Sequence, residues 1–190
     1  MSKTIVMIVG KTSSGKDTIM RYIKENYGFL DVCSYATRPM RNNETDGVEH
    51  HFVSKEKLHE IMETKDIVAY TKFPITEHEY CSTWDDLKGE FNTYIINPDG
   101  IRWFEENVDI EELYHYSIYV DLDEETIISR ALARGDDIEA IKSRLDSERE
   151  DMETFRDNRE YDFIVSTREI LPVVYGEIDD IMSQILKEVQ

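Results

Sequence analysis

The sequence has only two cysteines and no hydrophobic run near the ~20 residues that a membrane-spanning helix needs. Cys33 and Cys81 match no metal-ligand spacing, and two thiols make no disulfide framework, so a reducing cytosol is the expected compartment. The apolar stretch near the N-terminus is too short for a signal peptide and is typical of a buried first strand. These absences argue against a membrane protein and against a small disulfide-bonded secreted domain.

Positive charge is also scarce. The chain has 22 Lys and Arg against 41 Asp and Glu, which gives a net charge of −19 at pH 7. Non-specific nucleic-acid binding depends on basic side chains that neutralise phosphates, so the composition argues against it. The overall field would also repel any anionic substrate. A protein of this charge that handles phosphates must therefore gather its few cations around one site.

The order of patterns along the 190 residues predicts one α/β domain with a mainly parallel sheet, because strand patterns alternate with helix patterns. Gly28 is expected to end a helix, and Ser54 and Asp123 are expected to cap the starts of two others. The expected strands are Thr4–Val9, Phe29–Ser34, His51–Val53, Ile67–Phe73 and those within 91–97, 115–123 and 161–167. The expected helices are Thr18–Tyr27, Lys55–Glu63, a turn at Trp84–Lys88, 124–135, Ile138–Phe155 and a last one with Val174, Ile178, Ile181, Ile185 and Val189 on one face.

A phosphate-binding loop is predicted directly after the first strand. In "VGKTSSGKDTIM", Gly10, Gly15 and Lys16 satisfy the pattern G-x-x-x-x-G-K. A glycine loop between a buried strand and a helix directs several backbone N–H groups at an anion, and the helix dipole strengthens that attraction. Lys16 adds a flexible cation that can follow the β- and γ-phosphates. The strand before the loop and the helix after it favour this interpretation over a chance match.

Asp17 stands where the pattern expects a hydroxyl, and Thr18 follows it. A carboxylate in the first turn of a helix suits the dipole, but it repels phosphate unless Mg²⁺ or a basic side chain intervenes. In one interpretation the loop works with altered metal coordination, and Thr18 and Asp17 hold Mg²⁺. In the other, Asp17 points to solvent and only caps the helix.

The segment "SYATRPMRNNETDGVEHHFVS" places Arg38 and Arg41 around a proline and ahead of Glu44. Two guanidinium groups at short spacing on a loop can hold one phosphate through paired hydrogen bonds. The segment closely resembles the nucleoside-monophosphate-binding region of guanylate kinases, whose signature is roughly S-x-x-T-R-x-x-R-x-x-E-x-x-G-x-x-Y-x-F-x-S. The residues in register with it are Ser34, Thr37, Arg38, Arg41, Glu44, Gly47, Phe52 and Ser54.

The resemblance extends over nearly the whole chain. "EYCST" is similar to the family's Y-G-S/T segment, which implies that Tyr80 contacts a phosphate and that Ser82 or Thr83 lies near the base. "SRALARG" resembles the helix that leads into the family's lid, "IKSRLDSERED" resembles the arginine-bearing lid helix, and "YDFIVST" resembles the late strand. The lid helix would place Arg144 and Arg149 over the triphosphate, and the helix before the lid would contribute Arg130 and Arg134 to the site.

The fold that the resemblance implies is a phosphate-loop parallel sheet flanked by helices, with a small inserted acceptor-binding subdomain and a helical lid. The core would comprise residues 1–33, 90–130 and 160–190. The acceptor-binding subdomain would span about residues 34–89, and the lid about residues 131–159.

The reaction that the resemblance implies is transfer of the γ-phosphoryl group of ATP to a nucleoside monophosphate, GMP or dGMP, assisted by Mg²⁺, in a cytoplasmic monomer or homodimer. Such a transfer needs positioning and charge neutralisation more than covalent chemistry. The expected catalytic residues are Lys16, Arg38, Arg134 and Arg144. The expected ATP-phosphate site comprises Gly10, Ser13, Ser14, Gly15, Lys16, Asp17, Thr18 and Arg130. The expected acceptor site comprises Ser34, Arg38, Arg41, Glu44, His50, Tyr80, Ser82 and Asn97.

Three departures from the family pattern concern the acceptor. His50 stands where the family has a tyrosine, and it can still donate to a phosphate. Ala69 and Asn97 stand where the family has the two carboxylates that read the guanine edge. A pocket without them leaves guanine donors unpaired and loses much of its discrimination. Asn97 through its amide oxygen, or Glu77 or Glu79 from a longer loop, are candidate replacements.

Two other functions stay open on the sequence. "GKD" and an asparagine after the middle strand are also found in the related ribose bisphosphate phosphokinases, which act on a sugar phosphate. Some guanylate kinase-like domains bind phosphorylated peptides without catalysis, although those have lost the phosphate loop that Gly10, Gly15 and Lys16 preserve here.

Overall fold

A parallel sheet forms the core of the computed structural model, which describes residues 3–42, 44–73, 76–109, 113–158 and 161–189. In this part of the chain the sheet has five strands in the order β2-β7-β1-β8-β9. The central strand β1 (Lys3–Val9) is buried along nearly its whole length, as its continuous apolar run predicts. The other strands are β2 (Leu30–Asp31), β7 (Phe91–Ile95), β8 (Leu113–Asp121) and β9 (Phe163–Ser166).

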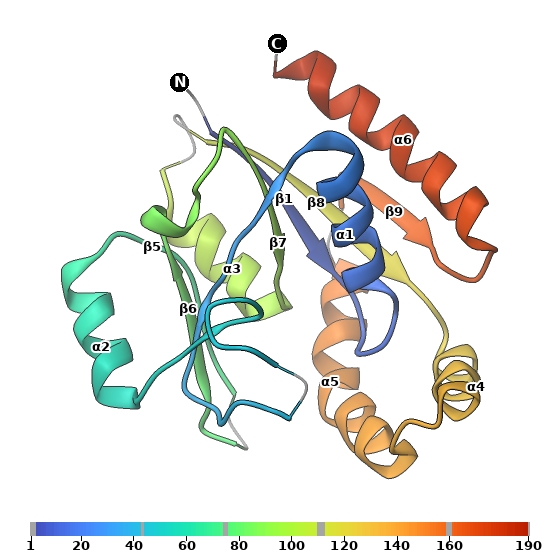
Figure 1. Cartoon of the computed structure of the whole chain (residues 1–190), viewed down its shortest axis with the longest axis horizontal. Coiled ribbons are helices and arrows are strands. Elements are labelled where there is room, and N and C mark those ends of the chain that lie inside the picture. The colour runs from blue at the N-terminus through green and yellow to red at the C-terminus, as the bar shows by residue number, and fades with distance from the viewer. Residues whose placement is uncertain (1–2, 43, 74–75, 110–112, 159–160, 190) are drawn as a thin grey trace.

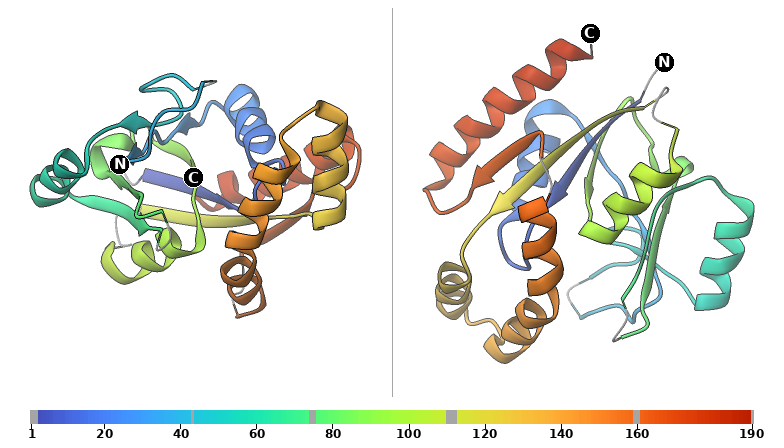
Figure 2. Two further views of the ribbon diagram at one scale, coloured as in Figure 1. Left: turned by 90° about the horizontal axis from the view of Figure 1, so that it is seen from below. Right: turned by 180° about the vertical axis from the view of Figure 1, so that it is seen from behind.

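Helices cover both faces of this sheet (Figures 1 and 2). On one face, α1 (Lys16–Tyr27) and α6 (Leu171–Glu188) pack against one set of alternating β1 side chains. On the other face, α3 (Pro98–Asn107) packs against the alternate set. The buried residues of α6 are Val174, Ile178, Ile181, Met182 and Ile185, while Val189 follows the helix as its C-cap. None of the described helices combines the length and the apolar composition of a membrane span.

A second, smaller sheet lies beside the core, within the segment where an insertion is predicted (Figure 1). Its strand order is β4-β3-β6-β5, with β3 and β4 parallel and the remaining pairs antiparallel. The helix α2 (Lys55–Thr64) packs against it, and a short 3₁₀ turn η1 (Trp84–Asp86) leads back to the core. Its strands are β3 (Tyr35–Ala36), β4 (His51–Phe52), β5 (Ile67–Lys72) and β6 (Glu79–Thr83).

The helix α5 (Ile138–Asn158) lies within residues 131–159, where the lid is predicted, whereas α4 (Glu124–Arg134) lies mostly in the part predicted as core. Ile141 and Leu145, in the first half of α5, share a small apolar cluster with α4. Met152 and Phe155, in the second half, belong instead to the cluster of the core sheet. The helix α5 is thus anchored to two different parts of the molecule.

The helix boundaries largely follow the local signals. Gly28 ends α1 with a left-handed φ of 72°, the Ser54 hydroxyl accepts from the Lys57 N–H at 3.2 Å, and the Asp123 carboxylate accepts from the Thr126 N–H at 2.8 Å. These three caps are confirmed. The side chains of Ser54 and Asp123 accept from N–H groups that a helix leaves without partners.

Two predicted elements differ in the structure. The strand predicted over Phe29–Ser34 is shortened to Leu30–Asp31, because the chain leaves the core sheet after Asp31 and joins the small sheet at Tyr35. The turn predicted at "NPDG" is the first turn of α3, in which Asn97 is the N-cap and Pro98 the first helical residue. Proline fits that position because the first N–H of a helix has no intrahelical partner.

Candidate active site

The loop between β1 and α1 has the backbone of an anion cradle. Gly10, Ser13 and Gly15 have φ of 153°, 57° and 103°. A Cβ atom added at Gly10 would lie 2.6 Å from the carbonyl oxygen of Val120, so only glycine fits where the loop passes the end of β8. The loop therefore has a fixed path from the buried strand into the first turn of α1.

Lys16 lies inside this loop. Its ammonium donates to the carbonyl oxygens of Gly10 at 2.6 Å and Lys11 at 2.7 Å. Burial lowers the pKa of Lys16 to about 8, although the carboxylates of Glu148 and Asp17 act in the opposite direction. An ammonium desolvated in this way gains strongly from a phosphate placed beside it.

The rest of the loop is tightly held. Thr167, after β9, donates its hydroxyl to the carbonyl of Ser14 at 2.6 Å. The Ser14 hydroxyl is buried and has no hydrogen-bond partner among the described residues. The N–H of Thr12 donates to the carboxylate of Glu148, on the predicted lid helix α5, at 2.9 Å. The predicted phosphate-site residues of the loop thus surround one site, and the Glu148 carboxylate contacts this site.

The two predicted magnesium ligands, Asp17 and Thr18, lie in the first turn of α1. Asp17 is exposed, and Thr18 is half-buried. Among the described residues no group of three or more His, Cys, Asp or Glu side chains is arranged to hold a metal ion. One carboxylate and one hydroxyl fit Mg²⁺ all the same, since proteins usually bind this ion through one or two side chains together with substrate phosphates.

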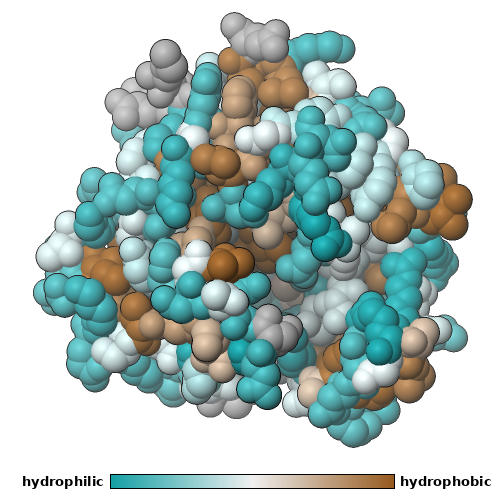
Figure 3. Space-filling model, viewed as in Figure 1, coloured by the Kyte–Doolittle hydropathy of each residue, from teal (hydrophilic) through white to brown (hydrophobic). Residues whose placement is uncertain are grey.

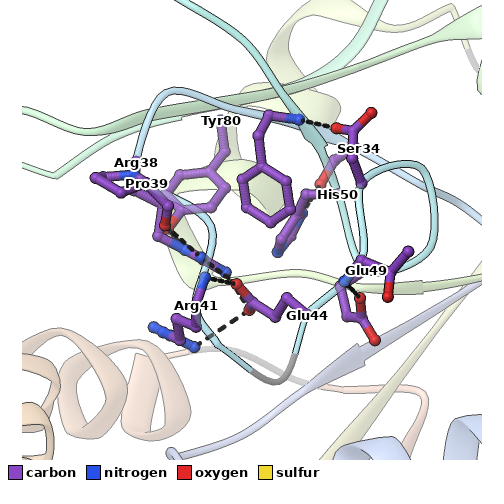
Figure 4. A network of polar contacts seen from close by, with 11 residues as sticks. Ser34, Arg38, Pro39, Arg41, Glu44, Glu49, His50 and Tyr80 are labelled. Carbon is purple, nitrogen blue, oxygen red and sulfur yellow. Dashed lines mark hydrogen bonds and ion pairs between the residues drawn. The ribbon is translucent and has the colours of Figure 1, made fainter.

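Arg38 is the centre of a buried polar network on the small sheet (Figure 4). Its guanidinium donates twice to the Glu44 carboxylate, at 2.6 Å each, and once to the Tyr80 hydroxyl at 3.0 Å. The bond from Arg38 lowers the pKa of Glu44 to about 2. Arg41 adds a backbone N–H bond to Glu44 at 2.8 Å and an ion pair at 3.6 Å. Glu44 therefore orients both arginines.

His50 lies at the edge of the same network (Figure 4). Its Nδ1 is 2.9 Å from the Ser34 hydroxyl, and its ring contacts those of Phe52 and Tyr80 edge-on. Burial, together with the nearby Arg38 guanidinium, lowers the pKa of His50. The imidazole is therefore neutral near pH 7 in the absence of a ligand.

An acceptor phosphate beside His50 should raise its pKa again, so binding should take up a proton and tighten as the pH falls. We expect the ratio of acceptor KM values, His50→Gln over wild type, to rise by about tenfold between pH 8 and pH 5.5, since a charge-assisted bond adds about 1.5 kcal/mol. Steady-state kinetics across this range measures the ratio, which cancels the titration of the acceptor phosphate itself. A ratio independent of pH would show that His50 does not meet the phosphate.

Arg144, on α5, lies between the loop and the arginine pair. Its positive charge lowers the pKa of both Lys16 and Arg41, after the larger effect of burial on each. Its side chain is half exposed, and Glu148 is its partner at 3.9 Å. Cations from the loop, the small sheet and the lid helix thus converge within an otherwise acidic protein.

These groups open on one cleft of about 790 Å³, large enough for two small phosphorylated molecules to meet. Figure 3 shows a mostly hydrophilic face with a hollow near its centre, where hydrophobic side chains are visible. Ser82, predicted near the base, is fully buried in β6, opposite Ala69 of β5, and its hydroxyl lies beside Tyr94. The predicted site residues that line the cleft are Gly10, Lys16, Ser34, Arg38, Arg41, His50, Tyr80, Asn97 and Arg144.

Ala69 and Asn97, which replace the family's carboxylates, both line the cleft. The Asn97 amide oxygen, the atom predicted to contact a base, already accepts from the Gly100 N–H at 3.0 Å and from the Thr71 hydroxyl at 2.7 Å. These bonds use both lone pairs of the oxygen, so it is committed to capping α3. Asn97 can therefore contact a base only through its amide nitrogen, which is a hydrogen-bond donor.

The two glutamates considered as substitutes point elsewhere. Glu77 is exposed and pairs with Lys72 at 2.5 Å. Glu79 is buried, and its carboxylate bonds His59 at 2.8 Å and Tyr70 at 3.1 Å. Neither belongs to the residues that line the cleft. The structure thus brings no replacement carboxylate from this loop to the cleft.

Arg130 and Arg134, on α4, lie outside the cleft lining. Arg130 donates to the carbonyl of Arg168 at 3.2 Å, and Arg134 pairs with Asp136 at 2.6 Å. Their predicted contacts with ATP phosphates require α4 to approach the loop. Sequence reasoning missed Glu148, although its position four residues after Arg144 places both on one face of a helix.

Comparisons with known proteins point to one family. The family model described as guanylate kinase matches residues 1–185. The guanylate kinase of Aliivibrio fischeri is 25% identical over 173 residues, covering 87% of this chain and 81% of the relative. That of Enterococcus faecalis is 26% identical over 198 residues, covering 94% and 87%. The crystal structure of guanylate kinase from Anaplasma phagocytophilum superposes with a TM-score of 0.62 at 16% identity, covering 100% and 88%, and supports the fold.

Proposed function

The chain belongs to the guanylate kinase family, and we propose that it transfers the γ-phosphoryl group of ATP to GMP or dGMP in the cleft between the phosphate loop and the small sheet. The observation that carries this proposal is the placement of Arg144. It is close enough to Lys16 and to Arg41 to affect the pKa of each, so it lies where two phosphates held by these groups would meet. Both cysteines are free, which supports a reducing cytosol as the location.

Each side chain has a role that follows from its position. The loop N–H groups and Lys16 would bind the β- and γ-phosphates of ATP. Arg38 and Arg41, oriented by Glu44, would hold the acceptor phosphate together with Tyr80 and His50. Arg144 would neutralise charge on the group in transit, and α5 would exclude water from it. Phosphoryl transfer needs no further general base here, because positioning and neutralisation supply most of its catalysis.

Mg²⁺ belongs to this proposal as the cofactor. Asp17 and Thr18 would hold it from the first turn of α1, and when bound it would neutralise charge on the phosphate oxygens it contacts. The proximity of the Asp17 carboxylate to Lys16 supports this assignment, since a metal ion relieves the repulsion between Asp17 and phosphate.

A screen of acceptors tests the proposed function. Purified protein with ATP and Mg²⁺ is offered each common nucleoside monophosphate and a ribose bisphosphate, and the diphosphate products are separated by chromatography. We expect ADP and GDP, or dGDP, to form in equal amounts. Turnover of the ribose bisphosphate alone would favour the sugar-phosphate alternative, and no turnover with any acceptor would contradict the proposal.

Ala69 offers a second prediction, about discrimination. The wild-type cleft has no carboxylate at this position to pair with the 2-amino group of guanine, so we expect kcat/KM for GMP and IMP to agree within about tenfold. Ala69→Glu should raise the GMP preference by about 10- to 100-fold, because hydrogen bonds to a charged group contribute about 1.5–3 kcal/mol.

The matched control is Ala69→Gln, which has nearly the same volume and no charge. Ala69 is only 1% exposed, so both variants are first checked for thermal stability. Equal GMP preference in the two variants, or a preference above 100-fold in the wild-type protein, would show that guanine is read by other groups.

A further inference from the structure

The lid helix places a carboxylate in the phosphate loop. Glu148 Oε2 accepts a hydrogen bond of 2.9 Å from the backbone N–H of Thr12, a residue that is buried. The same carboxylate is the main group that raises the pKa of Lys16 against the effect of burial. Glu148 thus contacts one loop N–H group and lies near the loop ammonium, two groups that a bound phosphate needs.

This carboxylate is largely buried and specifically held. Its side chain is 21% exposed, and Arg144, one helical turn earlier, is its partner at 3.9 Å. The helix around it is fixed by the Arg102–Asp151 ion pair at 2.6 Å on one side and by the Arg149–Glu124 pair at 2.7 Å on the other. Since α5 is anchored in the core through Met152 and Phe155, Glu148 is held over the cradle by the helix itself.

We propose that Glu148 is a built-in competitor for the phosphate loop, which ATP must displace in order to bind. This rests on the proposed function only in taking the loop as the ATP-phosphate site. A carboxylate and a phosphate compete for the same loop N–H groups. Because both are negatively charged, they also repel each other, so the two cannot occupy the loop together.

Displacement of Glu148 has a direct consequence for Arg144. The two residues lie on one face of α5, about 6 Å apart along the helix. When a phosphate takes the place of Glu148, Arg144 loses its carboxylate partner and meets a phosphate instead. The Glu148 carboxylate, which repels phosphate, leaves the loop, and the Arg144 guanidinium, which attracts phosphate, takes its place over the loop. ATP binding is thereby coupled to the placement of Arg144.

Binding of ADP to the whole protein tests this, by isothermal titration calorimetry at pH 6.5, where Lys16 stays protonated. We expect Glu148→Gln to lower the Kd for ADP by about tenfold, since one charge-assisted bond of about 1.4 kcal/mol no longer has to be broken. Inorganic pyrophosphate should show the same gain, because the competition concerns phosphate alone.

The matched control is Glu139→Gln. It removes the same charge from the same helix at a position that is 87% exposed and pairs only with Lys142 at 3.3 Å among the described residues. An unchanged Kd for ADP in Glu148→Gln, or an equal gain in ADP affinity in Glu139→Gln, would overturn this proposal. Neither result would contradict the proposed kinase function. Gain of ADP binding in Glu148→Gln, together with no turnover by the wild-type protein in the acceptor screen, would support this proposal and contradict the proposed function.

Discussion

Replacing Lys16 with alanine is expected to lower kcat by about 10³- to 10⁵-fold, the size of effect that transition-state cations have in phosphoryl transfer. The reason lies in its surroundings. The ammonium sits inside the loop, bonded to two loop carbonyls, and burial has lowered its pKa to about 8. A cation desolvated in this way interacts with phosphate far more strongly than one in water.

A coupled assay with saturating ATP and acceptor measures this loss. The control is Lys24→Ala in the same helix, where the side chain is half exposed and pairs with Asp31 at 2.7 Å; its turnover should match the wild type. The pH profile gives a second check. Because the pKa of Lys16 is lowered, the free enzyme loses this proton as the pH rises through about 8, and kcat/KM for ATP should fall there. A loss below tenfold in Lys16→Ala would contradict its assigned role.

Replacing Arg144 with alanine is expected to lower kcat by a similar factor, about 10³- to 10⁵-fold. This guanidinium is the one on α5 that lies near both Lys16 and Arg41, so it is placed to contact the group in transit. Since it meets that group mainly during transfer, kcat should fall far more than acceptor binding weakens.

Single-turnover kinetics with GMP separates the chemical step from binding. Lys142→Ala is the matched control, because it removes one positive charge from the same helix at a half-exposed position outside the cleft. Arg144→Lys should recover part of the activity, since charge is kept but the planar fork is lost. Equal losses of kcat in Arg144→Ala and Lys142→Ala would mean that only the net charge of the protein matters, and would contradict the role assigned to Arg144.

The fold could be predicted largely from local signals. The apolar run of β1, the glycine at the end of α1 and the caps at Ser54 and Asp123 each act within a few residues, so the sequence expresses them directly. The early end of the second predicted strand, after Asp31, could not be predicted in this way. Whether Tyr35 pairs in the core or in the small sheet depends on partners that are far away in the chain.

The candidate site follows the same division. The spacing of Arg38, Arg41 and Glu44 on one loop indicated a shared site, and the structure joins them through Glu44. The sequence did not indicate that Asn97 is the N-cap of a helix, because this role depends on α3 starting at the next residue. The position of Glu148 was hidden for a different reason, since it depends on how α5 lies over the loop.

The small apolar cluster beneath α4 has a consequence for heat resistance. Among the described residues, the buried members of this cluster come from the residue after β8 and from α4 and α5, and none of them belongs to the two larger clusters that hold the sheet: Leu122, Ile127, Ala131, Ile141 and Leu145. A unit with so few buried residues opens at a lower free energy than the whole domain. On warming, the protein should therefore lose its catalytic competence reversibly while most of its secondary structure is still intact, and inactivation should precede denaturation.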